Sequence, residues 1–270
     1  MITLVSIHSY PVKGCRGLDH ATARLTPAGL EHDREWMFAT PDGRFITQRD
    51  EPRLACIDAQ VRDGALHLGA EGAGAVAVPL ERDGPRRRVR VWNDECGAID
   101  QGDASAGWIT ALLGREVRLL RFDPAVPRPS DPAWVGDLDA PNRYSDGFPL
   151  LVASLASLAD LNARLEVPVP MERFRPNLVF DGLPPWGEDD LGEFACGEVR
   201  LRVVKPCTRC IVTTTDQRTG ERCGDEPVRT LRSFRWNAEL RGVVFGQNAV
   251  VVDGAGAMLE VGQAFVPAAR

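Results

Sequence analysis

The chain has 270 residues, of which 44% are hydrophobic and 26% charged, and its formal net charge at pH 7 is −6. The hydrophobic fraction is that of a globular protein with a sizeable core. The acidic balance argues against a general nucleic-acid binder, because such proteins neutralise phosphates with basic side chains. With no basic, apolar leader and no long apolar run, we expect neither a signal peptide nor a membrane span. The seven cysteines fit reduced thiols in a cytoplasmic protein better than a disulfide framework.

Short strands are predicted over most of residues 1–122, at 2–12, 35–40, 44–49, 56–61, 65–70, 87–92 and 116–122. The turns 41–43 and 62–64 contain Asp-Gly, and Gly accepts the positive φ that tight turns need. One helix is predicted at 104–113, ended by Gly114. The basic run 85–90 is typical of a solvated edge strand, with a polyanion site as the alternative.

The segment 123–141 contains five prolines. Proline removes a backbone donor and fixes φ, so we expect no helix and no central strand here. We interpret 123–143 as a Pro-rich linker or a long active-site loop, since loops of this length are usually one or the other.

Residues 144–270 are predicted to be strand-rich with few helices. Leucines at three- and four-residue steps over 154–165 predict a helix, capped by Ser154 or by Ser157 with Asp160. Another short helix is predicted at 226–235. Strands are predicted at 177–180, 198–204, 210–215, 243–252 and 257–262. Without βαβ alternation, the chain is expected to have a mainly β (α+β) fold and no doubly wound sheet.

Cys207 and Cys210 form a C-x-x-C motif in the stretch KPCTRCIVTTTD. An all-thiolate zinc site needs a second close pair, which the sequence does not offer. A redox dithiol normally begins a helix, whereas the β-branched residues after Cys210 predict a strand. Iron–sulfur spacings are also absent. A single thiolate ligand for a soft metal, backed by Lys205 and Arg209, fits the motif, and so do two small buried hydrophobic side chains.

Five stretches occur along the chain in this order: YPVKGCRG, GLEHDREWMFATPDGRFITQR, MERFRPNLVF, KPCTRCIVTTTDQRTG and VVFGQNAVVV. Together they resemble the family of proteins with a MOSC N-terminal β-barrel domain followed by a MOSC domain, which includes the mitochondrial amidoxime-reducing components and bacterial relatives. The resemblance covers nearly the whole chain. It implies a MOSC N-terminal β-barrel domain at 1–122 packed on a C-terminal β-barrel MOSC domain at 144–270.

The resemblance also implies the molybdenum cofactor, a Mo-pyranopterin dithiolene with a phosphate tail. Cys210 is the implied protein ligand to molybdenum, and Asp146 is our candidate for a proton relay near the metal. The residues expected to hold the cofactor are Lys13, Gly14, Cys15, Arg34, Asp146, Gly147, Arg175, Asn177, Thr208, Arg209 and Asn248. Arg and Lys suit the phosphate, and an amide suits the pterin edge.

Each of these residues also fits a structural role when taken alone. Arg34 and Arg175 fit surface ion pairs, Lys13 a solvated loop charge, and Asp146 and Asn177 turn positions. The remaining cysteines are expected to be structural, namely Cys56, Cys96, Cys196, Cys207 and Cys223. Two positions depart from the pattern of the family: Gly14 stands where relatives often have Ser, and Asn248 where a tyrosine can occur.

The activity that the resemblance implies is molybdenum-dependent reduction of N-hydroxylated compounds, such as amidoximes and hydroxylamines. We expect no appended iron–sulfur domain and no N-terminal membrane anchor, so electrons would come from a separate protein of ferredoxin, flavodoxin or cytochrome b5 type. A molybdenum-cofactor carrier or sulfur-transfer module without turnover is one alternative, and a zinc-stabilised binding protein is another. Pyridoxal phosphate binding is expected only as a signature of the family, because the chain has no separate domain for that cofactor.

Overall fold

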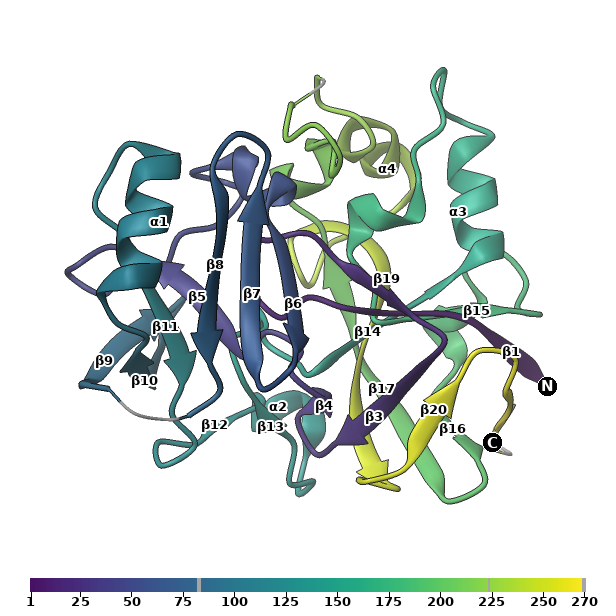
Figure 1. Ribbon diagram of the computed structural model, residues 1–270. Helices are drawn as coiled ribbons and strands as arrows, with labels where there is room; N and C mark the ends of the chain where they lie inside the picture. The colour runs from purple at the N-terminus through teal and green to yellow at the C-terminus, as the bar shows by residue number, and fades with distance from the viewer. Residues whose placement is uncertain (82–83, 223, 269–270) are drawn as a thin grey trace.

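The computed structural model describes residues 1–81, 84–222 and 224–268 and is mostly β (Figure 1). Seven strands close into a barrel. Their order around it is β14 (Leu150–Ser154), β15 (Leu178–Asp181), β1 (Ile2–Ser9), β21 (Ala264–Pro267), β16 (Glu193–Cys196), β17 (Val199–Thr208) and β19 (Gly242–Asp253), and β19 pairs again with β14. Closure leaves no free edge within this ring of strands.

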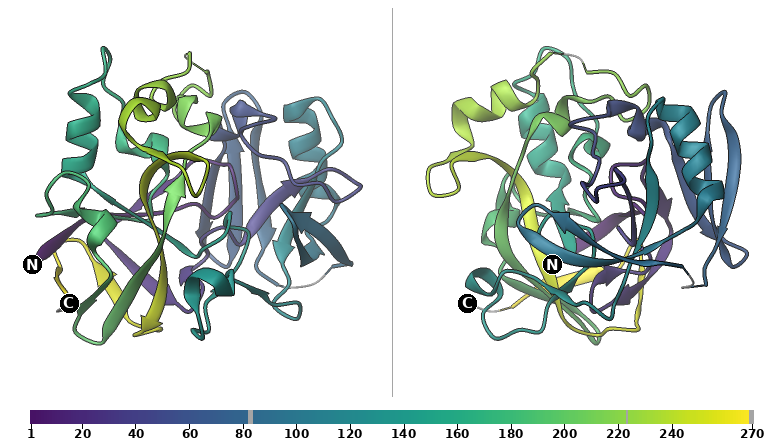
Figure 2. Two further views of the ribbon diagram at one scale, coloured as in Figure 1. Left: turned by 180° about the vertical axis from the view of Figure 1, so that it is seen from behind. Right: turned by 90° about the vertical axis from the view of Figure 1, so that its left-hand side faces the viewer.

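The barrel interior is filled by apolar side chains that alternate along its strands. Phe180 is fully buried and meets Phe194 and Phe265 edge-to-face, with ring centroids 5.5 and 5.3 Å apart. Strand β1 runs between β15 and β21, so the first residues of the chain belong to the barrel formed mostly by the second half. The left view of Figure 2 shows both chain termini at the barrel end of the molecule.

The remainder of the first half forms two smaller sheets. One has the strand order β5 (Trp36–Ala39), β11 (Arg118–Phe122), β10 (Asp94–Asp100) and β9 (Arg86–Val91), and the other consists of β6 (Asp58–Arg62), β7 (Ala65–Ala70) and β8 (Gly74–Pro79). Helix α1 (Asp103–Leu113) packs with them through Ile109, around the buried Trp36. These elements occupy the left of Figure 1, beside the barrel.

Short strands and helices complete the structure. The remaining strands are β2 (Leu18–His20), β3 (Thr22–Thr26), β4 (Gly29–Leu30), β12 (Arg128–Pro129), β13 (Pro141–Asn142), β18 (Trp236–Asn237) and β20 (Met258–Glu260). The helices are α2 (Pro132–Val135), α3 (Leu155–Asn162) and α4 (Val228–Phe234), with 3₁₀ turns η1 (Pro52–Cys56), η2 (Met171–Phe174), η3 (Gly187–Asp190) and η4 (Ile211–Thr214). None of the helices in the described ranges combines the length and the hydropathy that a bilayer crossing requires.

The predicted mainly β fold is confirmed, and so are the hairpin of β6 and β7, the helix α1 with Gly114 at its left-handed end, and the edge position of β9. The helix at 154–165 is confirmed as α3, capped by Ser154 rather than by Ser157. The expectation of no helix in the Pro-rich segment is wrong. One turn forms there as α2, because Pro132 occupies the first helical position and Asp131 caps it.

Two predicted strands are wrong, and both lie where the chain turns. Residues 44–49 make only isolated bridges before a turn, in which the Asp50 N–H donates to the Thr47 carbonyl. Residues 210–215 form the 3₁₀ turn η4. The Thr213 and Thr214 hydroxyls donate to the carbonyls of Cys210 and Ile211 at 2.9 and 2.8 Å, so local hydrogen bonds outweigh the strand propensity.

Candidate functional site

One cavity contains all but one of the predicted site residues. It encloses about 860 Å³ of space, part of it open to solvent, and lies between loops of the first half and the open ends of barrel strands. Its lining includes Lys13, Gly14, Arg34, Asp146, Gly147, Arg175, Asn177, Thr208, Arg209, Cys210 and Asn248. Segments far apart in the sequence therefore meet at one place.

Cys15 is the predicted site residue that does not line the cavity. Its side chain is fully buried in the apolar cluster around Trp36, and burial raises the pKa of its thiol. The neighbouring Gly14 faces the cavity instead, at φ +86°, a conformation that favours glycine. Cys15 thus packs the core beneath the cavity.

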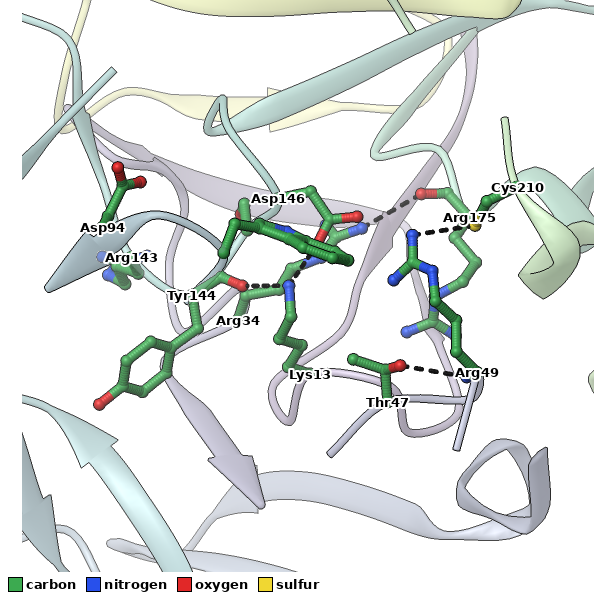
Figure 3. A network of polar contacts seen from close by, with 12 residues as sticks. Lys13, Arg34, Thr47, Arg49, Asp94, Arg143, Tyr144, Asp146, Arg175 and Cys210 are labelled. Atoms are coloured by element: carbon green, nitrogen blue, oxygen red, sulfur yellow. Dashed lines mark hydrogen bonds and ion pairs between the residues drawn. The ribbon is translucent and has the colours of Figure 1, made fainter. Parts of the chain in front are cut away.

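The Cys210 thiol lies at the start of the η4 turn, and an arginine that we did not predict contacts it. Arg49 donates from Nη2 to the Cys210 Sγ at 3.0 Å (Figure 3). The turn that follows Thr47 presents this arginine, and the Thr47 hydroxyl accepts from the Arg49 N–H at 3.1 Å. The guanidinium thus contacts the sulfur, the atom through which cysteine binds metals.

Cys207 also lines the cavity, where we had expected a structural role alone. Its Sγ accepts from Arg209 Nη1 at 2.9 Å, and Arg209 Nη2 donates to the Phe174 carbonyl at 2.7 Å. The Arg209 Nε is buried without a partner among the described residues. Both cysteines carry free thiols. Each accepts a hydrogen bond from a different arginine, Cys207 from Arg209 and Cys210 from Arg49.

Lys13 and Asp146 form an ion pair at the cavity wall. The Lys13 Nζ lies 2.5 Å from Asp146 Oδ1 and 2.7 Å from the Tyr144 carbonyl (Figure 3). Burial alone would raise the pKa of the Asp146 carboxyl, but the charge and hydrogen bond of Lys13, with Arg49 nearby, hold it well below its usual range. Burial lowers the pKa of Lys13, against the opposing effect of Asp146. The carboxyl of Asp146 is therefore ionised at neutral pH.

Arg128 holds the loop that carries Asp146. It is 3% exposed and donates to the carbonyls of Arg143, Ser145 and Asp146 at 2.7, 2.6 and 3.2 Å. Arg128 lies in the Pro-rich segment, so this part of the chain positions the cavity loop.

Arg34 and Arg175 both stack on the ring of Tyr10. Their guanidinium carbons lie 4.2 and 4.1 Å from the Tyr10 ring centroid, and both residues have left-handed backbones, with φ +46° and +55°. Arg34 forms a 2.5 Å ion pair with Asp33, whereas Arg175 has no carboxylate partner among the described residues and bonds Gln217 at 3.0 Å. Burial lowers the pKa of Arg175 to about 10 and raises that of Tyr10 to about 12.

Asn177 joins three strands beside these arginines. Its Oδ1 accepts from Arg34 at 3.0 Å and from the Leu151 N–H at 3.1 Å, and its Nδ2 donates to the His8 carbonyl at 3.1 Å. These bonds use much of the capacity of the amide, so Asn177 orients Arg34 more than it offers free donors to a ligand. Asn248, on β19, also lines the cavity.

Gln48, which lines the cavity, pairs with Gln217. Their amides exchange two hydrogen bonds of 2.9 Å, and Gln48 also donates to the Gly14 carbonyl at 2.7 Å. Gln48 and Arg49 fall inside one of the stretches that carry the family resemblance, which was the available signal for them. Nothing in the sequence pointed to Trp92, whose indole N–H donates to Asp146 Oδ1 at 3.2 Å.

The donor set fits an anionic group that carries a soft metal. Cationic side chains of the lining are Lys13, Arg34, Arg49, Arg175 and Arg209. The lining itself contains one carboxylate, Asp146, while Arg34 also pairs with Asp33, and the buried Arg209 Nε has an unused donor. Such an excess of fixed cations suits a phosphate, and the Cys210 thiol supplies a soft ligand.

A zinc cluster finds no comparable support. Within residues 1–81, 84–222 and 224–268, no group of three His, Cys, Asp or Glu side chains is placed to hold a metal ion. Cys223, which we expected to be structural, lies outside the described residues.

Comparisons with known proteins agree with this geometry. Residues 1–116 match the model of the MOSC N-terminal beta barrel domain and residues 139–266 that of the MOSC domain. Mitochondrial amidoxime-reducing component 1 of Homo sapiens is 38% identical over 243 residues, which cover 86% of this chain and 72% of the relative. Mitochondrial amidoxime reducing component 2 of Homo sapiens is 33% identical, with the same coverage of 86% and 72%.

Among solved structures, YiiM from Geobacillus stearothermophilus overlaps 45% of this chain and 55% of its own, with 18% identity and a TM-score of 0.32, from which we draw nothing. The sequence matches are sufficient by themselves, because both domains are found in order and the relatives align over most of their length. The chain belongs to the family that joins a MOSC N-terminal beta barrel domain to a MOSC domain, together with the mitochondrial amidoxime-reducing components.

Proposed function

We propose that the chain is a molybdenum-cofactor-dependent reductase of N-hydroxylated compounds, such as amidoximes and hydroxylamines. The observation that carries the proposal is the cavity itself, which joins one thiol, Cys210, to five cationic side chains from both halves of the chain. The relatives named amidoxime-reducing components support the class of reaction.

Cys210 would ligate the molybdenum, and the arginines and Lys13 would hold the phosphate and the electron-rich part of the cofactor. Thr208 on β17 and Asn248 on β19 also line the cavity and would contact the cofactor from these barrel strands. When bound, the cofactor supplies a two-electron redox centre that is also a Lewis acid. The protein's own contribution is to orient these cations before substrate arrives.

The Lys13–Asp146 pair is our candidate for proton movement. Reduction of an N–OH group releases water and therefore consumes protons. Asp146 is held ionised beside Lys13, so its carboxylate would hold the proton-bearing ammonium at the cavity wall. The Lys13 ammonium, with its pKa lowered by burial, is the member of the pair that bears a proton.

Electrons would come from a separate donor protein of ferredoxin, flavodoxin or cytochrome b5 type, and the setting we propose is the cytoplasm. The test is turnover. Protein produced in a host that makes the cofactor should reduce benzamidoxime to benzamidine with a chemical reductant. An intact cofactor without turnover would favour a carrier or sulfur-transfer module instead. Stoichiometric zinc without molybdenum would contradict the proposal outright.

A further inference from the structure

Trp92 occupies a position that a tryptophan rarely tolerates. The hairpin of β9 and β10 pairs Val91 with Asp94, so its loop has two residues, and Trp92 is the first of them, with φ +56°. Hairpins of this kind usually place glycine there, and a bulky side chain at positive φ is a conformational outlier. Such strain persists only where surrounding contacts impose it, and it is frequent at functional sites.

Two of the residues that contact Trp92, Arg49 and Asp146, line the cavity. Its ring meets Phe45 edge-to-face with centroids 5.0 Å apart, and its Nε1 donates to Asp146 Oδ1 at 3.2 Å. The Arg49 guanidinium lies over the indole, with its central carbon 4.5 Å from the ring centroid. The side chain nevertheless stays 41% exposed, so burial of apolar surface does not explain its placement.

Arg49 connects this ring to the thiol. Its guanidinium lies over the indole, while Nη2 reaches the Cys210 Sγ at 3.0 Å. Because a guanidinium is planar, stacking on the ring fixes the plane in which its N–H groups point. The indole N–H binds the same oxygen of Asp146 that accepts from Lys13. Trp92 thus contacts both Arg49, which reaches Cys210, and Asp146, which pairs with Lys13.

We propose that Trp92 is a positioning residue, which orients Arg49 on the Cys210 sulfur and holds Asp146 against Lys13. The indole does not touch the sulfur and acts through Arg49. The contact between Arg49 and Cys210 matters for catalysis only if the proposed molybdenum function holds. The coupling of Trp92 to Arg49 is a contact within the protein and can be measured without the cofactor. The two statements can therefore fail separately.

The first experiment uses the protein without cofactor. Denaturant unfolding of Trp92→Ala, Arg49→Gln and the double variant forms a cycle that isolates the pairwise interaction. We expect a coupling of about two- to fivefold in the unfolding equilibrium constant, the range of a cation–π contact at an exposed site. Additive effects would show that the stacking is incidental and would overturn the proposal, whether or not the protein binds molybdenum.

Trp92→Gly separates positioning from folding. Glycine accepts the positive φ without strain, so this variant should be at least as stable as Trp92→Ala and remains available if the alanine variant folds poorly. It nevertheless lacks the indole, and we expect it to lose activity as Trp92→Ala does. A Trp92→Gly protein with wild-type activity would overturn the proposal.

The second experiment uses the molybdenum-loaded protein. Trp92→Ala, Trp92→Gly and Arg49→Gln should each lower kcat about 10- to 100-fold, as loss of outer-sphere support at metal sites does, with a smaller change in KM. The electron paramagnetic resonance spectrum of the bound molybdenum should shift alike in all three. Trp92→Phe keeps a ring under Arg49 and should recover much of the loss.

Trp236 provides the matched control. It is 51% exposed and its ring centroid lies 5.9 Å from another arginine, Arg232, but among the described residues it contacts neither Arg49 nor Asp146. Trp236→Ala should leave kcat and the spectrum unchanged. If Arg49→Gln shifts the spectrum while the Trp92 variants keep the wild-type spectrum and kcat, Trp92 is not a positioning residue. If the wild type binds no molybdenum, the proposed function fails while the unfolding cycle still decides the role of Trp92.

Discussion

The Lys13 ammonium lies 2.5 Å from Asp146 Oδ1, across 133 positions of sequence, and the two partners differ sharply in exposure. The Lys13 side chain is 7% exposed and that of Asp146 is 63% exposed. Removing the carboxylate therefore leaves a buried cation with no ionic partner among the described residues, beside the Tyr144 carbonyl and the Phe45 ring. Removing the lysine leaves a carboxylate that faces solvent in the cavity.

This asymmetry predicts the order of two substitutions. Asp146→Asn should lower the free energy of unfolding by about 1–3 kcal/mol, because a buried charge loses its ionic partner. Lys13→Met should change it by less than about 1 kcal/mol, because it removes the buried charge itself. Urea unfolding of both variants without cofactor measures the order, and the reverse order would refute the assignment of Lys13 as the buried partner.

Glu35 makes stability depend on pH in the acid range. Its side chain pairs with His32 Nδ1 and Arg121 Nε, each at 2.8 Å. Burial alone would raise the pKa of Glu35, but the hydrogen bond from His32 and the charge of Arg121 lower it from 4.5 to about 2. The unfolded chain binds more protons between these values, so the contribution is fully present above 4.5 and is lost as the pH falls toward about 2.

We therefore expect Glu35→Gln to flatten the acid limb of the stability curve. The Glu35 contribution is on the order of 3 kcal/mol for a shift of this size. The free energy of unfolding should decline less steeply for the variant than for the wild type between about pH 5 and pH 3. Urea titrations at several pH values would show this, and parallel curves for the two proteins would contradict it.

Thr213 shapes the turn that presents the thiol. It is fully buried, and its hydroxyl donates to the Cys210 carbonyl at 2.9 Å. Thr213→Val keeps the shape of the side chain but loses this donor, so it should lower the free energy of unfolding by about 1 kcal/mol and reduce the molybdenum retained. Thr213→Ser keeps the hydroxyl and should restore both quantities. Equal behaviour of the valine and serine variants would rule the hydrogen bond out as the cause.

Substitution of Cys210 and of Cys207 should have different effects. Cys210→Ala should abolish activity and weaken molybdenum retention, since the variant lacks the proposed ligand. Cys207→Ala loses a sulfur that accepts from Arg209, so it should affect stability more than metal content. Activity with benzamidoxime and metal analysis test both variants. If both remained fully active, the assignment of the ligand would be wrong.

The sequence correctly predicted several elements that depend on local residue patterns. Two short strands on either side of the Asp-Gly turn at 62–64 predicted the hairpin of β6 and β7, and Gly114 predicted the end of α1. The strand predicted at 210–215 failed because threonine has a second property besides β-branching. Its hydroxyl can bond a carbonyl three residues back, and two such bonds form the turn at Cys210.

Family motifs predicted which segments meet, but they could not predict which way each side chain faces. Cys15 directly follows two cavity residues and yet packs in the core, because neighbouring side chains leave the backbone in different directions. Arg49 and Trp92 lie on two separate turns. The fold brings Arg49 onto the Trp92 ring beside Cys210, and no spacing in the sequence predicts this contact.

The central claim is that this cavity holds a molybdenum cofactor through Cys210. The most direct measurement is metal and pterin analysis of the wild type and of Cys210→Ala, both purified from a host that makes the cofactor. The account predicts molybdenum and pterin in matching amounts in the wild type and a loss of molybdenum in the variant. Stoichiometric zinc with no molybdenum and no pterin fluorescence in the wild type would contradict it.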